Sequence, residues 1–191
     1  MLIKTENEIR KLIKSDKWMM DILKAVRSMN LPDCWVCAGF VRSKIWDVLH
    51  ERNERSSIPD VDVIYFDPTN LDELNEKKHE EKLRMILPDV PWSVKNEARM
   101  HIRNNMLPYS SSVDAIAKFP ETATALGVKL DINDKLILTA PHGIMDLINL
   151  EVKPTPFFTE NIDQAAIYEN RIKKKNWKSI WNRIKIHHIQ P

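Results

Sequence analysis

The chain has 191 residues, of which 43% are hydrophobic, so it can bury a core as one large domain or two small ones. Its 29 basic and 27 acidic residues give a net charge of +2, which rules out a charge signature for nucleic-acid binding over the whole chain. The sequence has no membrane-length apolar run and no signal-peptide pattern, so we expect a cytoplasmic globular protein with no membrane partner.

Residues 1–30 predict two short amphipathic helices. Thr5 followed by Glu8 matches a capping box, and Asp16 is suited to cap the second helix. Apolar residues recur at helical spacing after each cap, so both helices are expected to face the core. The segment "NLPD" at residues 30–33 then ends the helical pattern.

Residues 35–52 predict a strand, a glycine and a helix in succession. The apolar run from Trp35 to Ala38 ends at Gly39, one of only three glycines, and a helical pattern then resumes. Backbone amides at a helix start favour an anion, and Arg42 could add positive charge there. A tight turn or close packing would explain a lone glycine equally well, so both interpretations stay open.

Both cysteines lie in "CWVC", as Cys34 and Cys37. One such pair supplies two of the four ligands of a structural zinc site, and the two thiols would point to opposite sides of a strand. We therefore expect buried structural cysteines, with no zinc or redox site.

Residues 58–67, "IPDVDVIYFD", predict a strand with two carboxylates on one face. Asp60 and Asp62 are two positions apart, which places them about 6.5 Å apart on the same side. Apolar residues fill the rest of both faces, and at that distance the repulsion of two buried carboxylates is about 2 kcal/mol. A divalent cation would relieve it, whereas solvated aspartates at the start of an ordinary strand remain the alternative.

The region from residue 71 to residue 140 predicts a mixture of helices and strands. Residues 71–87 predict a charged helix, and "KLILTA" at 135–140 predicts a strand. Ser112 is suited to cap a short helix, and a further helix is expected from Pro120 to Gly127.

The segment "PWSVKNEARMH" at residues 91–101 alternates as a strand would. Alternation puts Lys95, Glu97, Arg99 and His101 on one face, and this mixture of charges could line a cleft.

The chain after Glu169 is basic and contains no acidic residue. Apolar residues that include Trp177 and Trp181 recur there at roughly helical spacing. Two interpretations remain open. The segment docks its tryptophans on the core and leaves a solvated basic face, or the basic face contacts RNA.

The glycine turn followed by the Asp-x-Asp strand resembles the nucleotidyltransferase superfamily with the polymerase-beta-like fold, whose motif is a helix-opening Gly-Gly or Gly-Ser and then Asp-x-Asp. The chain is also similar, from about Trp35 onward, to a bacterial family of nucleotidyltransferase-like proteins. The similarity is carried by "WVCAGFVRSKIWDVLH", "PDVDVIYFDP", "WSVKNEARMH", "FPETATALGV" and "APHGIMDLINLEVKPTPFF". It implies a fold and an activity, and no substrate.

Two departures from the superfamily pattern bear on phosphate binding. Phe40 stands where the superfamily has Gly or Ser, and the stretch from Gly39 to Asp60 is longer than usual. Triphosphate binding is therefore less firmly implied than metal binding.

The fold implied by the resemblance is an α/β (α+β) fold, a small mixed sheet flanked by helices with helical segments at both ends. We expect one compact unit, with N-terminal helices at 1–30, a nucleotidyltransferase core at 31–160 and a basic helical segment at 161–191.

The activity implied by the resemblance is metal-dependent transfer of a nucleoside monophosphate from an NTP to an unidentified acceptor, which could be a small molecule, RNA or protein. Asp60 and Asp62 would hold two Mg²⁺ ions, or Mn²⁺ in their place, with Glu97 as a third carboxylate and Asp146 as its competitor. The nucleotide-binding candidates are Gly39, Phe40, Arg42, Lys95 and Arg99. The alternative is a weakly active or inactive module that keeps the fold and serves in binding or regulation.

Overall fold

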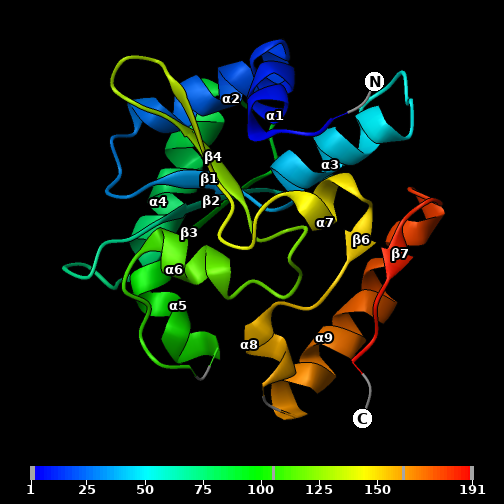
Figure 1. Cartoon of the computed structure of the whole chain (residues 1–191). Helices are drawn as coiled ribbons and strands as arrows, with labels where there is room; N and C mark the ends of the chain where they lie inside the picture. The colour runs from blue at the N-terminus through cyan, green and yellow to red at the C-terminus, as the bar shows by residue number, and fades with distance from the viewer. Residues whose placement is uncertain (1–2, 105, 161, 190–191) are drawn as a thin grey trace.

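The computed structural model describes residues 3–104, 106–160 and 162–189, and a five-stranded sheet lies at its centre (Figure 1). The sheet order is β3-β2-β1-β4-β5, in which β2 and β3 are parallel and the other neighbouring pairs are antiparallel. The strands are β1 (Trp35–Cys37), β2 (Val61–Tyr65), β3 (Trp92–Asn96), β4 (Gly127–Leu130) and β5 (Leu136–Thr139). The expected small mixed sheet is confirmed.

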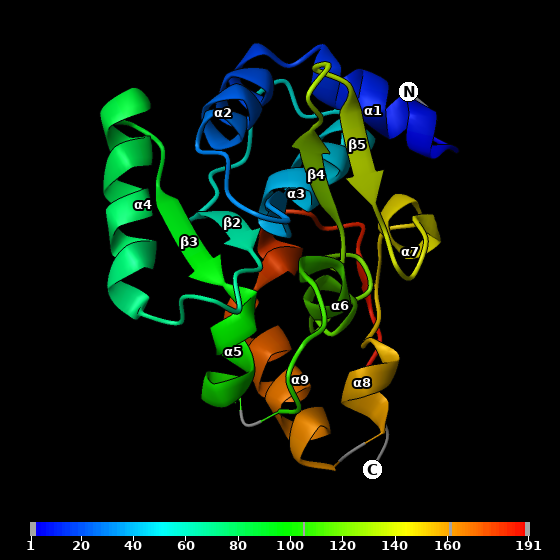
Figure 2. The ribbon, with the colours of Figure 1, turned by 90° about the vertical axis from the view of Figure 1, so that its left-hand side faces the viewer.

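Helices flank this sheet (Figure 2). A second, two-stranded sheet forms near the C-terminus (Figure 1). The helices before β4 are α1 (Glu6–Lys14), α2 (Lys17–Ser28), α3 (Gly39–Leu49), α4 (Glu73–Ile86), α5 (Glu97–Asn104) and α6 (Ser112–Ala117). The elements after β5 are α7 (Met145–Ile148), β6 (Glu151–Val152), α8 (Pro156–Thr159), α9 (Ile162–Lys175), the 3₁₀ turn η1 (Trp177–Ser179) and β7 (Lys185–Ile186). None of the helices in the described ranges combines the length and the apolar character needed to traverse a bilayer.

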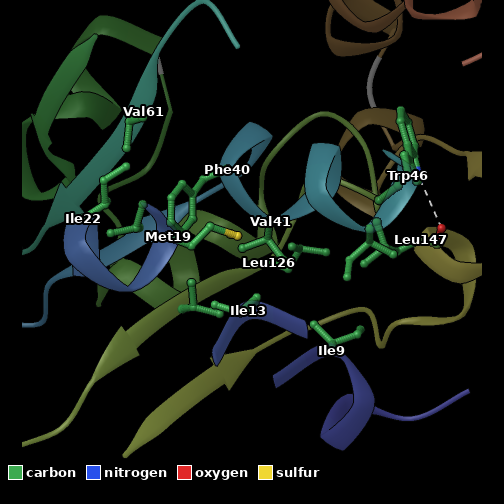
Figure 3. Close-up of a cluster of buried hydrophobic side chains, with 14 of the residues drawn as sticks. Ile9, Ile13, Met19, Ile22, Phe40, Val41, Trp46, Val61, Leu126 and Leu147 are labelled. Carbon is green, nitrogen blue, oxygen red and sulfur yellow. Dashed lines mark hydrogen bonds between the residues drawn. The ribbon is translucent and has the colours of Figure 1, made fainter. Parts of the chain in front are cut away.

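The N-terminal helices start where their caps predict. Thr5 and Glu8 form a complete capping box, and the Asp16 carboxylate accepts a hydrogen bond from the Met19 amide. Local side-chain to backbone bonds of this kind depend on residues three apart, so the sequence alone locates them. The apolar faces of both helices and of α3 are completely or almost completely buried in one core (Figure 3).

The predicted strand at residues 91–101 is wrong after Asn96, where α5 begins. The Asn96 side chain accepts hydrogen bonds from the Asp67 and Ala98 amides and donates to the carbonyls of Asp67 and Asn70. These bonds end the strand and turn the chain. Because a helix rotates by about 100° per residue, Arg99 no longer shares a face with Glu97.

The predicted helix from Pro120 to Gly127 is also wrong. The Thr122 amide donates to the Lys153 carbonyl, and Glu121 forms an isolated bridge with Pro154. Backbone groups in this stretch therefore pair with a distant segment, while Gly127 begins β4. The cap of α6 is Ser111, whose hydroxyl accepts from the Asp114 amide, and not Ser112.

The basic C-terminal segment is helical only to Lys175, so the expected continuous helix is wrong beyond that residue. Asn176 has φ 43°, a left-handed conformation that stops the helix. Trp177 and Trp181 are nevertheless buried, and their rings lie 5.8 and 5.2 Å from the Trp46 ring in edge contacts. The interpretation in which these tryptophans dock on the core is confirmed.

Asp47 links α3 to the loop before β2 and to this docked segment. Its buried carboxylate accepts hydrogen bonds from the Ser56 amide at 2.8 Å, the Ser56 hydroxyl at 2.5 Å and the Trp181 indole at 2.8 Å. The loop before β2 and the docked C-terminal segment therefore share one acceptor on α3.

Asp47→Ala is expected to lower the free energy of unfolding by about 2–4 kcal/mol, because it leaves three buried donors without an acceptor. Urea denaturation followed by tryptophan fluorescence measures the loss. The control is Asp21→Ala, which removes the exposed Lys17–Asp21 pair and is expected to cost less than about 0.5 kcal/mol. Equal losses in the two variants would contradict a structural role for Asp47.

Candidate active site

The alternation of β2 places Asp62 on the less covered face of the sheet. Val61, Val63 and Tyr65 belong to the main core, whereas Ile64 belongs to a small second cluster with Trp35 and Cys37. Asp62 pairs in register with Cys37 and shares the face of Ile64. The carboxylate of Asp62 therefore points away from the main core and toward two cavities.

The smaller cavity has a volume of about 130 Å³ and joins the helix start to both aspartates. Asp60 precedes β2 and is exposed, while Asp62 is half-buried. Its wall includes Gly39 at the helix start and five charged residues, Arg42, Asp60, Asp62, Arg171 and Lys175.

The larger cavity has a volume of about 470 Å³ and adjoins the smaller one, because Ala38, Asp62 and Arg171 line both. Lys95 and Glu97 lie in its wall beside Asp62. Its apolar lining includes Ile64, Met100, Tyr109, Phe119, Phe158 and Ile167.

A third hollow of about 600 Å³ is lined by Cys34 instead of Cys37, so it lies on the other side of β1. Its charged lining residues are engaged: Arg27 pairs with Asp134, and Lys129 lies 3.9 Å from Asp33. Cys34 and Cys37 are both free thiols; Cys37 is buried, as expected, whereas Cys34 is only partly buried, and burial raises the pKa of Cys34 to about 12.

The carboxylates that face the two adjoining cavities have no counterion. Burial, and then the charge of Asp60, raises the pKa of Asp62 to about 6. Burial, followed by the charges of Glu76 and Asp62, raises the pKa of Glu97 to about 7. Across the described ranges, no hydrogen bond or ion pair reaches the carboxylates of Asp60, Asp62 or Glu97.

Metal-ligating side chains do not form a closed cluster. Among the described residues, no group of three His, Cys, Asp or Glu side chains is placed to hold a metal ion. Any ion at Asp60 and Asp62 would therefore need further oxygen ligands that are not carboxylates of this cluster.

Ala38, not Gly39, has the glycine-like backbone at the start of α3. Its φ of 54° and ψ of −117° lie in a region that L-residues rarely adopt. Its amide donates to Leu126 and its carbonyl accepts from the Arg42 amide, which fixes the turn. A Cβ added to Gly39 would meet only Arg42 Nη2 at 3.5 Å, an ordinary contact.

Phe40 and Arg42 lie on opposite sides of the first turn of α3. Phe40 is buried in the main core, where its ring lies 5.8 Å from that of Trp18, and it lines neither cavity. Arg42 is buried with its guanidinium 5.2, 4.4 and 5.6 Å from the rings of Trp46, Trp177 and Trp181. Burial lowers the pKa of Arg42 to about 10, so it stays charged at neutral pH.

Two further predicted residues lie outside both cavities. Arg99 donates from Nε and Nη2 to Glu76, which is completely buried. Asp146 accepts hydrogen bonds of 2.7 Å from Thr122 and from Lys153. Of the two candidates for a third carboxylate, only Glu97 is brought beside Asp62.

Arg171 and Lys175 line the smaller cavity, and the motif analysis missed both. They are four apart on α9 and so lie on one side of that helix. The sequence showed them as part of a basic tail. Their spacing was the available signal, but it does not identify the surface that they face.

Comparison with known proteins gives a consistent result. A family model described as Nucleotidyltransferase matches residues 24–186. A solved protein whose NMR structure "reveals a CCA-adding enzyme head domain" is 36% identical, with a TM-score of 0.88 over 97% of both chains. A comparison with curated proteins finds none that matches.

Longer enzymes share the fold. The Thermotoga maritima CCA-adding enzyme complexed with tRNA is 17% identical with a TM-score of 0.56, and a CCA-adding enzyme complexed with ATP is 15% identical with a TM-score of 0.52. Each match covers 94% of this chain and 42% of the enzyme, so this chain spans less than half of their length.

Asp62→Asn is expected to stabilise the metal-free protein at pH 7.5 by about 1–3 kcal/mol. In the unfolded chain the carboxyls of Asp62 and Glu97 have ordinary pKa values of 3.8 and 4.5. As the pH rises, the folded chain therefore keeps protons on Asp62 and Glu97 at pH values where the unfolded chain has already lost them. Stability should therefore fall as the pH rises from about 4 to about 7, and less steeply in the variant. Denaturation in EDTA across this range measures the difference.

Asp146→Asn is the matched comparison, and it is expected to change the free energy of unfolding in the opposite direction. Partial burial opposes the effect, but hydrogen bonds from Lys153 and Thr122 lower the pKa of Asp146. Its charge should stabilise the fold at neutral pH, so its loss is expected to cost up to about 1 kcal/mol. If both variants lost stability at pH 7.5, the strain assigned to Asp62 would be wrong.

Ala38→Gly is expected to raise the free energy of unfolding by about 0.5–1 kcal/mol, because glycine relieves the backbone strain at this turn. Ala25→Gly, in the middle of α2, should instead destabilise by about 1 kcal/mol. Thermal and urea unfolding of the pair would show whether the sign depends on position, and destabilisation by both changes would refute the strained turn.

Proposed function

Because the chain belongs to the nucleotidyltransferase family, we propose that it transfers a nucleoside monophosphate from an NTP to an acceptor hydroxyl with the help of divalent metal ions. The observation that carries this proposal is the small cavity, where Asp60 and Asp62 meet the start of α3. Two unpaired carboxylates and several cations face the same space, which suits a metal-bound polyphosphate.

The residues present fit Mg²⁺, with Mn²⁺ as a substitute. Mg²⁺ in phosphoryl-transfer sites commonly uses one or two carboxylates, with waters and substrate phosphates as its other ligands. Asp60 and Asp62 would hold two such ions, and Glu97 would act from the larger cavity beside Asp62, outside a closed three-carboxylate cluster. When bound, the ions would neutralise phosphate charge and lower the pKa of the acceptor hydroxyl.

The two adjoining cavities would bind different parts of the nucleotide. The small one, with Arg42, Arg171 and Lys175 in its wall, suits phosphates, because these side chains are the strongest phosphate-binding groups available. The large one has aromatic side chains and enough room for a nucleoside. The reacting phosphate would then lie where the cavities meet, beside Asp62.

RNA is the acceptor class that the large cavity favours. The exposed Arg103 is in its wall beside Lys95 and Lys118, which pair with Glu76 and Asp114, and such cations attract a phosphate backbone. The solved enzyme of this fold complexed with tRNA supports the same choice. A terminal ribose hydroxyl entering the large cavity would approach the carboxylates.

The first test is label transfer from ATP, CTP, GTP and UTP, each with Mg²⁺, to acceptors in a cell extract. We expect Asp60→Asn and Asp62→Asn each to reduce transfer by at least about 100-fold, because each removes charge that holds the metal. Chelation with EDTA should abolish transfer, and ribonuclease treatment of the product identifies an RNA acceptor.

A paired comparison tests the third carboxylate. Glu97→Gln should reduce transfer strongly, whereas Asp146→Asn should retain it, because Asp146 faces neither cavity. Nucleotide binding without transfer to any acceptor in the extract would instead favour the module that binds but does not turn over.

A further inference from the structure

The fold carries Arg171 and Lys175 from the C-terminal helix to the carboxylates of β2, and we propose that these two residues bind the triphosphate of the donor nucleotide. The inference rests on the proposed function and adds the residues that hold the donor. Both side chains line the cavity of about 130 Å³ that contains Asp60 and Asp62.

Arg171 is held in place by a buried carboxylate. Its Nε donates to Oε1 of Glu121 at 2.6 Å, and Glu121 is completely buried. The other oxygen, Oε2, accepts from the Thr124 hydroxyl at 2.7 Å. Because the bridge to Pro154 also fixes the Glu121 backbone, the guanidinium is positioned before any ligand arrives.

This anchor leaves the outer edge of the guanidinium available. Within the described parts of the chain, the Glu121 bond is the only hydrogen bond of the Arg171 side chain, so Nη1 and Nη2 have no hydrogen-bond partner, and the guanidinium lies 5.9 Å from the Trp177 ring. The side chain is 32% exposed. Two parallel N–H groups on a fixed arginine match two oxygens of a phosphate, a geometry that a lysine cannot offer.

The neighbouring arginines show that this arrangement is specific to Arg171. Arg99 uses both Nε and Nη2 on Glu76, so its donors are already occupied by a structural partner. Arg42 is enclosed by three tryptophan rings and contributes charge from behind the cavity wall. Among the described arginines that line either cavity, Arg171 is the one that combines a buried carboxylate anchor with terminal nitrogens that form no hydrogen bond.

The position of Lys175 indicates a chain of phosphates. Lys175 is one helical turn from Arg171, so the two Cα atoms are about 6 Å apart along α9. Both face a cavity too small for a nucleoside, and two carboxylates lie in the same wall. A metal-bound triphosphate supplies several adjacent anionic groups within such a space, which an isolated phosphate or an extended strand of RNA does not.

The test uses inorganic tripolyphosphate with Mg²⁺ as the probe and calorimetry as the measurement. Arg171→Met and Arg171→Lys should each weaken binding by about 10- to 100-fold, because both remove the two-pronged contact. Lys175→Met should weaken it by a smaller factor. The matched control, Lys174→Met, changes an exposed lysine of the same helix that lines neither cavity, and should bind within about twofold of wild type.

A second readout separates binding from folding. Arg171→Met leaves Glu121 buried without its cation and is expected to lower the melting temperature. Arg171→Lys keeps a positive charge near Glu121, so it should melt close to wild type while binding remains weak. A lysine variant that binds tripolyphosphate as well as wild type would overturn the proposal, as would equal weakening by Lys174→Met.

The experiments distinguish failure of the proposed phosphate site from failure of the proposed transfer reaction. Binding of tripolyphosphate that depends on Arg171, in a protein that transfers no label, would refute the transfer reaction and support the phosphate site. Label transfer with an unchanged KM for the nucleotide in Arg171→Lys would refute the phosphate site and leave the reaction standing.

Discussion

The constraint on which the site depends is negative charge that the fold concentrates but does not neutralise. Asp60, Asp62 and Glu97 lie near three cations, yet none of the described cations pairs with them. Two of these cations are held by other partners: Arg42 by tryptophan rings and Arg171 by Glu121. An ion pair between these groups would neutralise the charge that faces the cavity. The fold therefore keeps opposite charges close but separate, at a cost that the large apolar core offsets.

Much of the fold could be predicted because its signals are local. The caps at Thr5 and Asp16 involve residues three apart, and the apolar periods of α1, α2 and β2 report burial directly. The errors arose where a distant segment decides the conformation. Asn96 ends β3 by bonding to residues 67 and 70, and residues 121 and 122 pair with residues 153 and 154 instead of forming a helix. No pattern within either segment reports these partners.

The site residues, too, include some that local motifs predict and some that depend on distant parts of the chain. Gly39, Arg42, Asp60 and Asp62 belong to short motifs, and the structure places them around one cavity. The glycine-like conformation at Ala38 could not be predicted, because alanine gives no sign of it in sequence. Arg171 lies more than a hundred positions after Asp62, so its presence in the cavity depends on the course of the entire chain. Arg99 is an error of the opposite kind: it was predicted to bind the nucleotide, but its guanidinium pairs with Glu76.

The docking of the C-terminal segment makes the cavity depend on a late part of the sequence. Trp177 and Trp181 enclose Arg42, and Arg171 and Lys175 complete the cavity wall, so the surroundings of Asp62 are finished by residues more than a hundred positions further along the chain. Before this segment docks, the sheet and its aspartates lack two of the three cations that line the small cavity. The charged cavity therefore forms only when this segment packs against the sheet and α3.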